Sequence, residues 1–199
     1  EARARAAFDD AVRAAPDAEV HGFWPVFYTP FYERLGLSPD CVSDAIEMTQ
    51  VANDTGLGIW KEPAEGLDEL LDELAIMRMG AGVISNSDGR LEERLAEIGI
   101  LNRFDFVIDS AVVGVSKPNS RIFEMALEKS GLKAADAAYV GDYYEVDVVG
   151  ARAVGMRPIL LDPAGAYGDV DCEVVSSLID VVELLRADGD GGTRSGEHG

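Results

Sequence analysis

Two carboxylates lie close together where an apolar segment gives way to a predicted helix. Asp142 follows residues 139–141, a run that predicts the end of a buried strand, and Asp147 lies about one and a half turns further along the helix. Open α/β sheets bind ligands at the carboxyl ends of their strands, and magnesium prefers carboxylate oxygens. Asp142 and Asp147 are therefore candidate metal ligands. The alternative is that Asp142 caps the helix and Asp147 is a solvated helix residue.

Other polar residues occur at the ends of two earlier segments. Ser85 and Asn86 follow an apolar run that begins at Gly80, and they offer a hydroxyl and backbone amides to an anion, although both residue types are also common in turns. Lys117 comes where a helix is predicted to open, and the helix dipole disfavours a cation there. Local helix energetics therefore does not explain Lys117. Its ammonium could neutralise phosphate or carboxylate charge, and the alternative is a solvated surface lysine.

Alternating strands and helices must position these residues. Apolar spacing predicts helices at residues 67–76, 91–98, 122–131 and 146–155, and strands at residues 80–86, 104–109, 137–140, 157–161 and 172–175. This alternation predicts a doubly wound parallel α/β sheet with right-handed crossovers and helices on both faces. Such a sheet places the carboxyl ends of its strands, and hence the polar residues above, at one site.

The chain divides into three predicted regions. Residues 1–61 form a small all-helical domain, in which one helix begins at Ser38. Its aromatic run at residues 21–32 either packs the core of this domain or lines a substrate pocket. Residues 62–186 form the α/β core. Residues 187–199 are rich in glycine and polar residues, and we expect a disordered tail.

The charge balance narrows the range of partners. With 17 lysines and arginines against 37 acidic residues, the 199-residue chain has a formal net charge of -20. This charge repels phosphate backbones and anionic lipid surfaces, so we expect neither a nucleic-acid nor a membrane partner. No apolar run reaches the length of a membrane span, and Cys41 and Cys172 lack the spacing of a metal site. A cytoplasmic protein is expected.

The strand-end residues, taken together, resemble three motifs of the haloacid dehalogenase-like (HAD) hydrolase superfamily. The apolar strand that ends at Ser85 resembles the second motif, Ser116-Lys117-Pro118 the third, and Gly141-Asp142 with Asp147 the fourth. The resemblance covers about residues 62–185. It implies a Rossmann-like core, with the N-terminal residues as a helical cap inserted between the first and second motifs.

The resemblance also implies an activity for the complete protein. This is a magnesium-dependent phosphatase that hydrolyses a small phosphorylated metabolite through an aspartyl-phosphate intermediate. Asp142 would bind Mg²⁺ directly, and Asp147 would act through water or orient Lys117. Ser85 and Asn86 would bind phosphoryl oxygens, and Lys117 would pair with the nucleophile and the transferring group. A monomer or homodimer is expected.

The first motif of the family, a strand that ends in the nucleophilic aspartate, has no counterpart in the sequence. Asp9-Asp10 lies in an alanine-rich helical context and does not replace it. We therefore expect an N-terminally incomplete sequence, and no activity from the 199 residues as they stand. The alternatives are a haloacid dehalogenase, which Gly141-Asp142 disfavours, and a non-catalytic HAD-like binding protein. A receiver-like phosphoacceptor at Asp109 would need an acidic pair that the sequence lacks.

Overall fold

The computed structural model describes residues 13, 32–33, 36–54 and 63–191, with side chains omitted at 49–54 and 188–191. The described strands are β1 (Gly82–Ser85), β2 (Phe106–Asp109), β3 (Ala138–Gly141), β4 (Arg157–Leu161) and β5 (Glu173–Val175). The described helices are α3 (Pro39–Asp54), α4 (Leu67–Ile76), α5 (Leu91–Glu97), α6 (Ser110–Val113), α7 (Ser120–Ser130), α8 (Val149–Ala153) and α9 (Leu178–Gly191). Two short 3₁₀ turns, η1 (Leu101–Arg103) and η2 (Ala134–Asp136), and a π-helical segment, η3 (Tyr144–Val148), complete the described elements.

The described strands form two parallel groups. β1 pairs with β2, so that Ser85 lies opposite Asp109 at their carboxyl ends. The other group has the order β3-β4-β5. Within the described residues, β1 and β3 do not pair with each other. The predicted doubly wound parallel α/β core is confirmed, with its strands divided between two groups.

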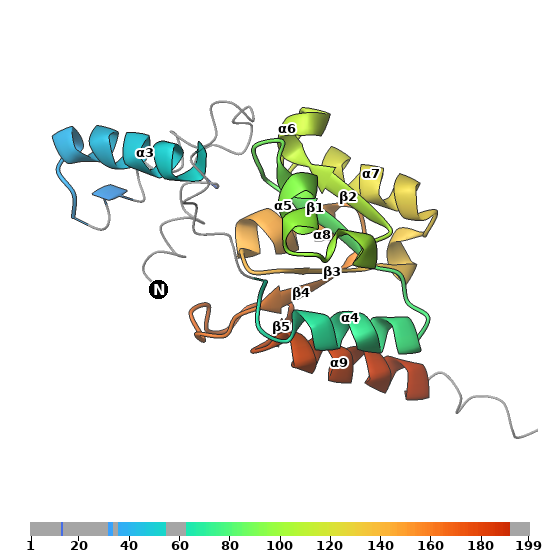
Figure 1. The fold of residues 1–199 in the computed structure, drawn as a ribbon. Helices are drawn as coiled ribbons and strands as arrows, with labels where there is room; N and C mark the ends of the chain where they lie inside the picture. The colour runs from blue at the N-terminus through green and yellow to red at the C-terminus, as the bar shows by residue number, and fades with distance from the viewer. Residues whose placement is uncertain (1–12, 14–31, 34–35, 55–62, 192–199) are drawn as a thin grey trace, which may run out of the picture.

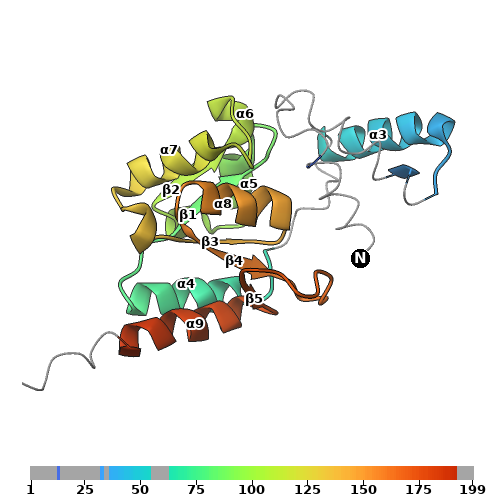
Figure 2. The ribbon, with the colours of Figure 1, turned by 180° about the vertical axis from the view of Figure 1, so that it is seen from behind.

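Helices cover the strands on two sides. The helices α4 and α9 lie together on one side, and α7 and α8 lie on the other (Figures 1 and 2). On the first side, apolar residues of α4 and α9 pack against β4 and β5, and the buried members are Leu70, Ile159, Val175, Leu178, Val181 and Val182. No helix in the described part of the chain is long and apolar enough to cross a membrane.

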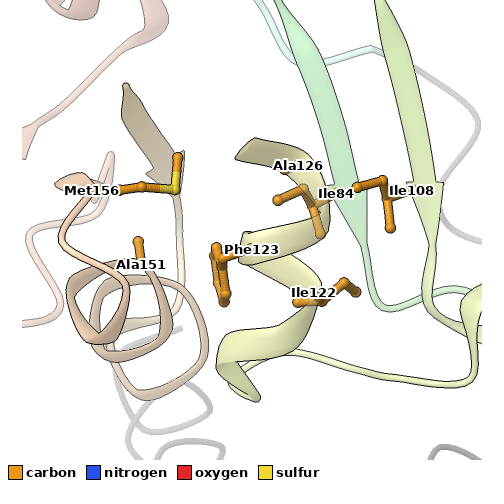
Figure 3. Packing of buried hydrophobic residues seen from close by; sticks show 7 residues of the cluster. All are labelled: Ile84, Ile108, Ile122, Phe123, Ala126, Ala151 and Met156. Atoms are coloured by element: carbon orange, nitrogen blue, oxygen red, sulfur yellow. The ribbon is translucent and has the colours of Figure 1, made fainter. Parts of the chain in front are cut away.

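The apolar cluster on the other side joins α7 and α8 to β1 and β2 (Figure 3). Its buried members are Ile84, Ile108, Ile122, Phe123, Ala126, Ala151 and Met156. A Cβ atom at Gly150 would lie 2.4 Å from the Phe123 ring, so only glycine lets α8 approach α7 this closely. The cluster anchors the start of α7 and the end of β1, which are the segments next to Lys117 and Ser85.

The described elements correct the sequence predictions at three places. The tail was predicted from Ala187, but α9 continues to Gly191, because backbone hydrogen bonds extend a helix beyond its last packed turn. The predicted helix after β3 begins as the π-helical segment η3. An unpredicted short helix, α6, follows β2.

The predicted cap domain is only partly described. The helix α3 begins at Pro39, directly after Ser38, as its capping sequence predicted. Most other residues of the region 1–61, including the aromatic run at 21–32 apart from its last residue, Tyr32, lie outside the described residues. The boundaries of the cap domain stay a prediction, and so does the role of its aromatic residues.

Candidate active site at the strand ends

A buried ion pair joins two of the predicted site residues. Lys117 Nζ lies 2.7 Å from Asp147 Oδ1, and the two side chains are 12% and 3% exposed. The other carboxylate oxygen of Asp147 accepts a hydrogen bond from the backbone N–H of Tyr143, at 3.0 Å. Both oxygens of Asp147 are therefore engaged within the protein, and the ammonium is fixed at the end of β3. The third motif and the fourth motif meet in this contact.

The environment of Lys117 keeps its side chain charged. Burial alone would lower the pKa of this ammonium, but the charge of Asp147 and hydrogen bonds to Asp147 and Tyr139 more than offset burial. The net effect raises the pKa of Lys117 above its ordinary value of 10.5. The site therefore presents a permanent positive charge at neutral pH, as the binding of an anionic group requires.

The backbone of Lys117 is tied to the end of β1 by the side chain of Asn86. Asn86 Oδ1 accepts from the N–H of Lys117 at 2.8 Å, and Asn86 Nδ2 donates to its carbonyl oxygen at 2.9 Å. The sequence suggested that Lys117 opens a helix. Instead, Asn119 caps α7, and Lys117 lies before the helix. The peptide bond between Lys117 and Pro118 is cis. The side chain of Asn86 thus positions Lys117. The predicted contact of Asn86 with a phosphoryl group stays a prediction.

Glycine is required on steric grounds at the last position of β3, Gly141, directly before Asp142. A Cβ atom at Gly141 would lie 2.3 Å from the carboxyl carbon of Asp147, so glycine is required for the carboxylate to lie against the strand end. The π-helical segment η3 contains Asp147. π-Helical turns occur often at functional sites, and this turn directs the carboxylate of Asp147 back towards Lys117.

A loop after β4 supports the turn that carries Asp142. The hydroxyl of Tyr167 donates to the carbonyl oxygen of Asp142 at 3.3 Å and accepts from the N–H of Tyr144 at 3.2 Å. The buried carboxylate of Asp162 accepts from the N–H groups of Ala166 and Tyr167, at 2.9 and 3.0 Å, and so holds this loop. Sequence reasoning missed Tyr167 and Asp162. The turn-forming Asp162-Pro163 dipeptide was the available signal for the loop, but not for its contact with Asp142.

The fit to a magnesium ion is partial. Asp142 is half-buried at the end of β3 and would supply one carboxylate ligand. Both oxygens of Asp147 are occupied by Lys117 and Tyr143, which favours an orienting role over direct ligation. The described residues contain no group of three or more His, Cys, Asp or Glu side chains that could hold a metal. The metal roles of Asp142 and Asp147 stay predictions, and further ligands would come from backbone carbonyls, water or carboxylates outside the described residues.

Ser85 lies at the end of β1, next to Asn86 and therefore next to the Lys117 backbone. Its side chain is half-buried, and no described residue hydrogen-bonds its hydroxyl. Tyr139, on β3, was placed in a strand by the sequence but given no role. Its hydroxyl contacts both Lys117 Nζ and the carbonyl oxygen of Ile84. A tyrosine in an apolar strand close to Asp142 was the available signal, because a buried hydroxyl needs a partner.

Comparison with known proteins identifies the family. Residues 41–161, more than half of the chain, match the family model described as haloacid dehalogenase-like hydrolase. The chain belongs to this family. It is 39% identical over 124 residues to the mouse protein named haloacid dehalogenase-like hydrolase domain-containing protein 3, an alignment that covers 60% of this chain and 49% of that protein. The family assignment agrees with the resemblance carried by Ser85, Lys117, Asp142 and Asp147.

Two further similarities bear on activity and on fold. The chain is 34% identical over 129 residues to the glyceraldehyde 3-phosphate phosphatase of Methanocaldococcus jannaschii, covering 59% of this chain and 55% of that protein. The chain spans about half the length of the curated relatives it matches. A 2-haloacid dehalogenase from Pseudomonas syringae pv. Tomato DC3000 matches by structure with a TM-score of 0.62, 21% identity and coverage of 93% of this chain and 80% of that one. This last similarity shows the fold alone.

Proposed function

We propose that the protein is a magnesium-dependent phosphatase of small phosphomonoesters that works through an aspartyl-phosphate intermediate. The observation that carries the proposal is the ammonium of Lys117, fixed by Asp147 at the end of β3 and joined through Asn86 to the end of β1. A fixed cation beside a strand-end hydroxyl suits the developing charge of phosphoryl transfer. The sequence similarity to a protein named as a glyceraldehyde 3-phosphate phosphatase supports the same reaction class.

Each described residue has a separate task in this proposal. Lys117 donates its remaining N–H to a phosphoryl oxygen, and its positive charge also offsets the charge of the nearby nucleophilic carboxylate. Ser85 donates its hydroxyl to a second phosphoryl oxygen. Asp147 holds the ammonium in place without contacting the substrate. Asp142 would hold the magnesium ion, which when bound neutralises the phosphoryl charge and aligns the reacting groups.

The nucleophile is expected outside the described residues. Within them, the strands β1 and β3 are not paired with each other. We place an additional parallel strand beside these two, with an aspartate at its carboxyl end facing Lys117. Residues upstream of Glu1 would supply this strand. The 199 residues alone are then expected to lack hydrolytic activity.

A direct test compares two lengths of the protein. The 199-residue chain and the chain extended by its natural upstream residues are assayed with Mg²⁺ and a panel of phosphomonoesters that includes p-nitrophenyl phosphate and glyceraldehyde 3-phosphate. We expect hydrolysis by the extended chain only, and its loss when Mg²⁺ is chelated. Magnesium-dependent hydrolysis by the 199 residues would show that the nucleophile lies within them. Lack of hydrolysis by both chains would count against the phosphatase proposal.

Two alternatives predict different outcomes in the same assay. A dehalogenase would release halide from a 2-haloacid and would not need Mg²⁺, and it has the support of the shared fold alone. A non-catalytic relative would hydrolyse nothing at either length. The receiver-like alternative has less support, because Asp109 is buried and both of its oxygens accept backbone hydrogen bonds. Such a carboxylate is a loop tie rather than an available phosphoacceptor.

The cellular setting also belongs to the proposal. The acidic surface favours a small phosphorylated metabolite as substrate over nucleic acid or a membrane surface. We propose a cytoplasmic monomer or homodimer. Fractionation of cells and size-exclusion chromatography with light scattering test these two points.

A further inference from the structure

The phenol of Tyr139 contacts the lysine at the centre of the proposed site. Lys117 Nζ donates to Tyr139 Oη at 2.8 Å, and the same nitrogen lies 5.4 Å from the centre of the ring. The hydroxyl in turn donates to the carbonyl oxygen of Ile84 at 3.3 Å. Ile84 directly precedes Ser85 on β1. One side chain of β3 therefore contacts both the lysine and the strand that carries the serine.

The hydrogen bonds of Lys117 leave one donor for a substrate. A lysine ammonium has three N–H groups. Among the described residues, its acceptors are Asp147 Oδ1 at 2.7 Å and Tyr139 Oη at 2.8 Å. Two acceptors in fixed positions set the direction of the third N–H, which is available to an oxygen that carries negative charge. With Asp147 alone, Nζ would be held from one side and could pivot about that single contact, which would redirect its remaining N–H groups.

The position of the phenol is itself fixed. The ring of Tyr139 packs edge-on against Phe123, with centroids 5.0 Å apart and an interplanar angle of 79°. Phe123 is fully buried and held by α7. The single hydroxyl proton of Tyr139 is donated to Ile84, so its oxygen presents lone pairs to the ammonium. Burial raises the pKa of Tyr139, so the phenol stays neutral where Lys117 is charged.

We propose that Tyr139 is a positioning residue that aims the third N–H of Lys117 at the phosphoryl group bound beside Ser85. This role rests on the proposed phosphatase function, but the contact itself can be measured without activity. Replacing Tyr139 by phenylalanine keeps the ring and its packing on Phe123. It removes the acceptor for Lys117 and the donor to Ile84.

Lysine-selective NMR of the full 199-residue chain measures this contact. The chain has four lysines, of which Lys129 and Lys133 are exposed and Lys61 lies outside the described residues, so the ammonium signal of Lys117 is assigned by its absence from the spectrum of Lys117→Met. In Tyr139→Phe we expect the exchange of this signal with water to be at least about tenfold faster, as for a lost hydrogen bond to a charged group. Tyr144→Phe is the matched control, because its hydroxyl contacts Asp171 and Arg152 instead.

Unchanged exchange in a folded Tyr139→Phe variant would overturn the proposal. Should that variant not fold, the unaltered protein still tests the contact, because the ammonium protons must show nuclear Overhauser effects to the ring protons of Tyr139. Their absence would also overturn it. If neither the unaltered extended chain nor its Tyr139→Phe variant hydrolyses phosphomonoesters, the phosphatase proposal is refuted. Equal turnover by the wild type and Tyr139→Phe refutes the positioning role alone.

Discussion

Asp147 and Asp109 are both buried, and both lie near the carboxyl end of a strand, but only Asp147 binds a cation. Asp109 accepts hydrogen bonds from the backbone N–H groups of Gly89, Leu91 and Ala111, at 2.9 to 3.1 Å. These donors are neutral, and they join the loop before α5 to the start of α6. One oxygen of Asp147 also accepts a backbone N–H, that of Tyr143, but its other oxygen binds the ammonium of Lys117. The partner of a buried strand-end carboxylate, rather than its presence, therefore distinguishes a carboxylate that holds a loop from one that belongs to a charged site.

Removing the charge of Asp147 tests the ion-pair side of this comparison and has the largest expected effect. Asp147→Asn leaves the ammonium of Lys117 buried without a counter-charge. We expect the free energy of unfolding to fall by about 3–5 kcal/mol, as for other buried pairs that lose one partner. Urea denaturation measures the change. If Asp147→Asn lowers the free energy of unfolding no more than a surface substitution does, the ammonium of Lys117 does not depend on Asp147 for its counter-charge.

Alkali breaks the same pair without a mutation. Because the pKa of Lys117 is raised in the folded state, its contribution to stability is complete below the unfolded value of 10.5 and is lost as pH rises through the folded value. The stabilisation of the wild type relative to Lys117→Met should therefore be constant up to about pH 10 and decrease above it. Thermal or urea unfolding across this range checks the direction. A difference that stays flat to the highest accessible pH would contradict the raised pKa.

Gly141→Ala disturbs the position of Asp147 and leaves both charges in place. The added Cβ atom would lie 2.3 Å from the carboxyl carbon of Asp147, so the carboxylate must move. We expect a cost of about 1–3 kcal/mol from overpacking and faster exchange of the Lys117 ammonium. The matched control is Gly131→Ala, where a Cβ meets no atom within 4 Å and only the positive φ of 70° is strained. Equal effects of the two variants on Lys117 would contradict the steric account.

Asp109→Asn tests the loop-tie side of the comparison. The amide keeps one acceptor oxygen, but its NH₂ group faces backbone donors, so we expect a loss of about 1–3 kcal/mol. The exchange of the Lys117 ammonium should not change, because Asp109 makes no hydrogen bond with it. A change at Lys117 in the NMR spectrum would show that the two sites are coupled.

The smallest effect is expected for an exposed pair. A guanidinium nitrogen of Arg152 lies 3.0 Å from Asp171 Oδ1, but the side chains of Arg152 and Asp171 are 41% and 71% exposed. Removing such a charge typically costs about 0–1 kcal/mol, and we expect Asp171→Asn to fall in that range. A cost comparable to that of Asp147→Asn, measured in the same urea experiment, would remove the distinction between buried and exposed pairs.

Local patterns predicted the parts of the site that depend on one segment. Period and turn residues located β1 and β3, whereas the expectation that Asp147 orients Lys117 came from the family resemblance and not from a local pattern. The contacts of Tyr139 and Tyr167 depend on segments far apart in the sequence, so no local pattern contained them. The predicted contact of Asn86 with substrate stays a prediction, and the pairing of its side chain with the backbone of Lys117 was not predicted.

The fold was predictable to the same extent. The apolar stripes predicted α4 and α7, because a helix that packs on a sheet must bury one face. The π-helical start of the helix after β3 was not predictable, since it depends on the ion pair of Asp147 with Lys117, which lies on a distant segment. The division of the strands into two groups likewise depends on pairing, which period alone does not specify.

The most direct test of the account is the turnover of the extended chain with Lys117 replaced. We predict that Lys117→Met lowers magnesium-dependent phosphomonoester hydrolysis by at least about 100-fold, as for the loss of a group that stabilises developing charge. Lys129→Met, at an exposed lysine, should leave hydrolysis unchanged. Backbone NMR spectra of both variants confirm that they fold. Turnover by a folded Lys117→Met variant that equals the wild type would contradict the account.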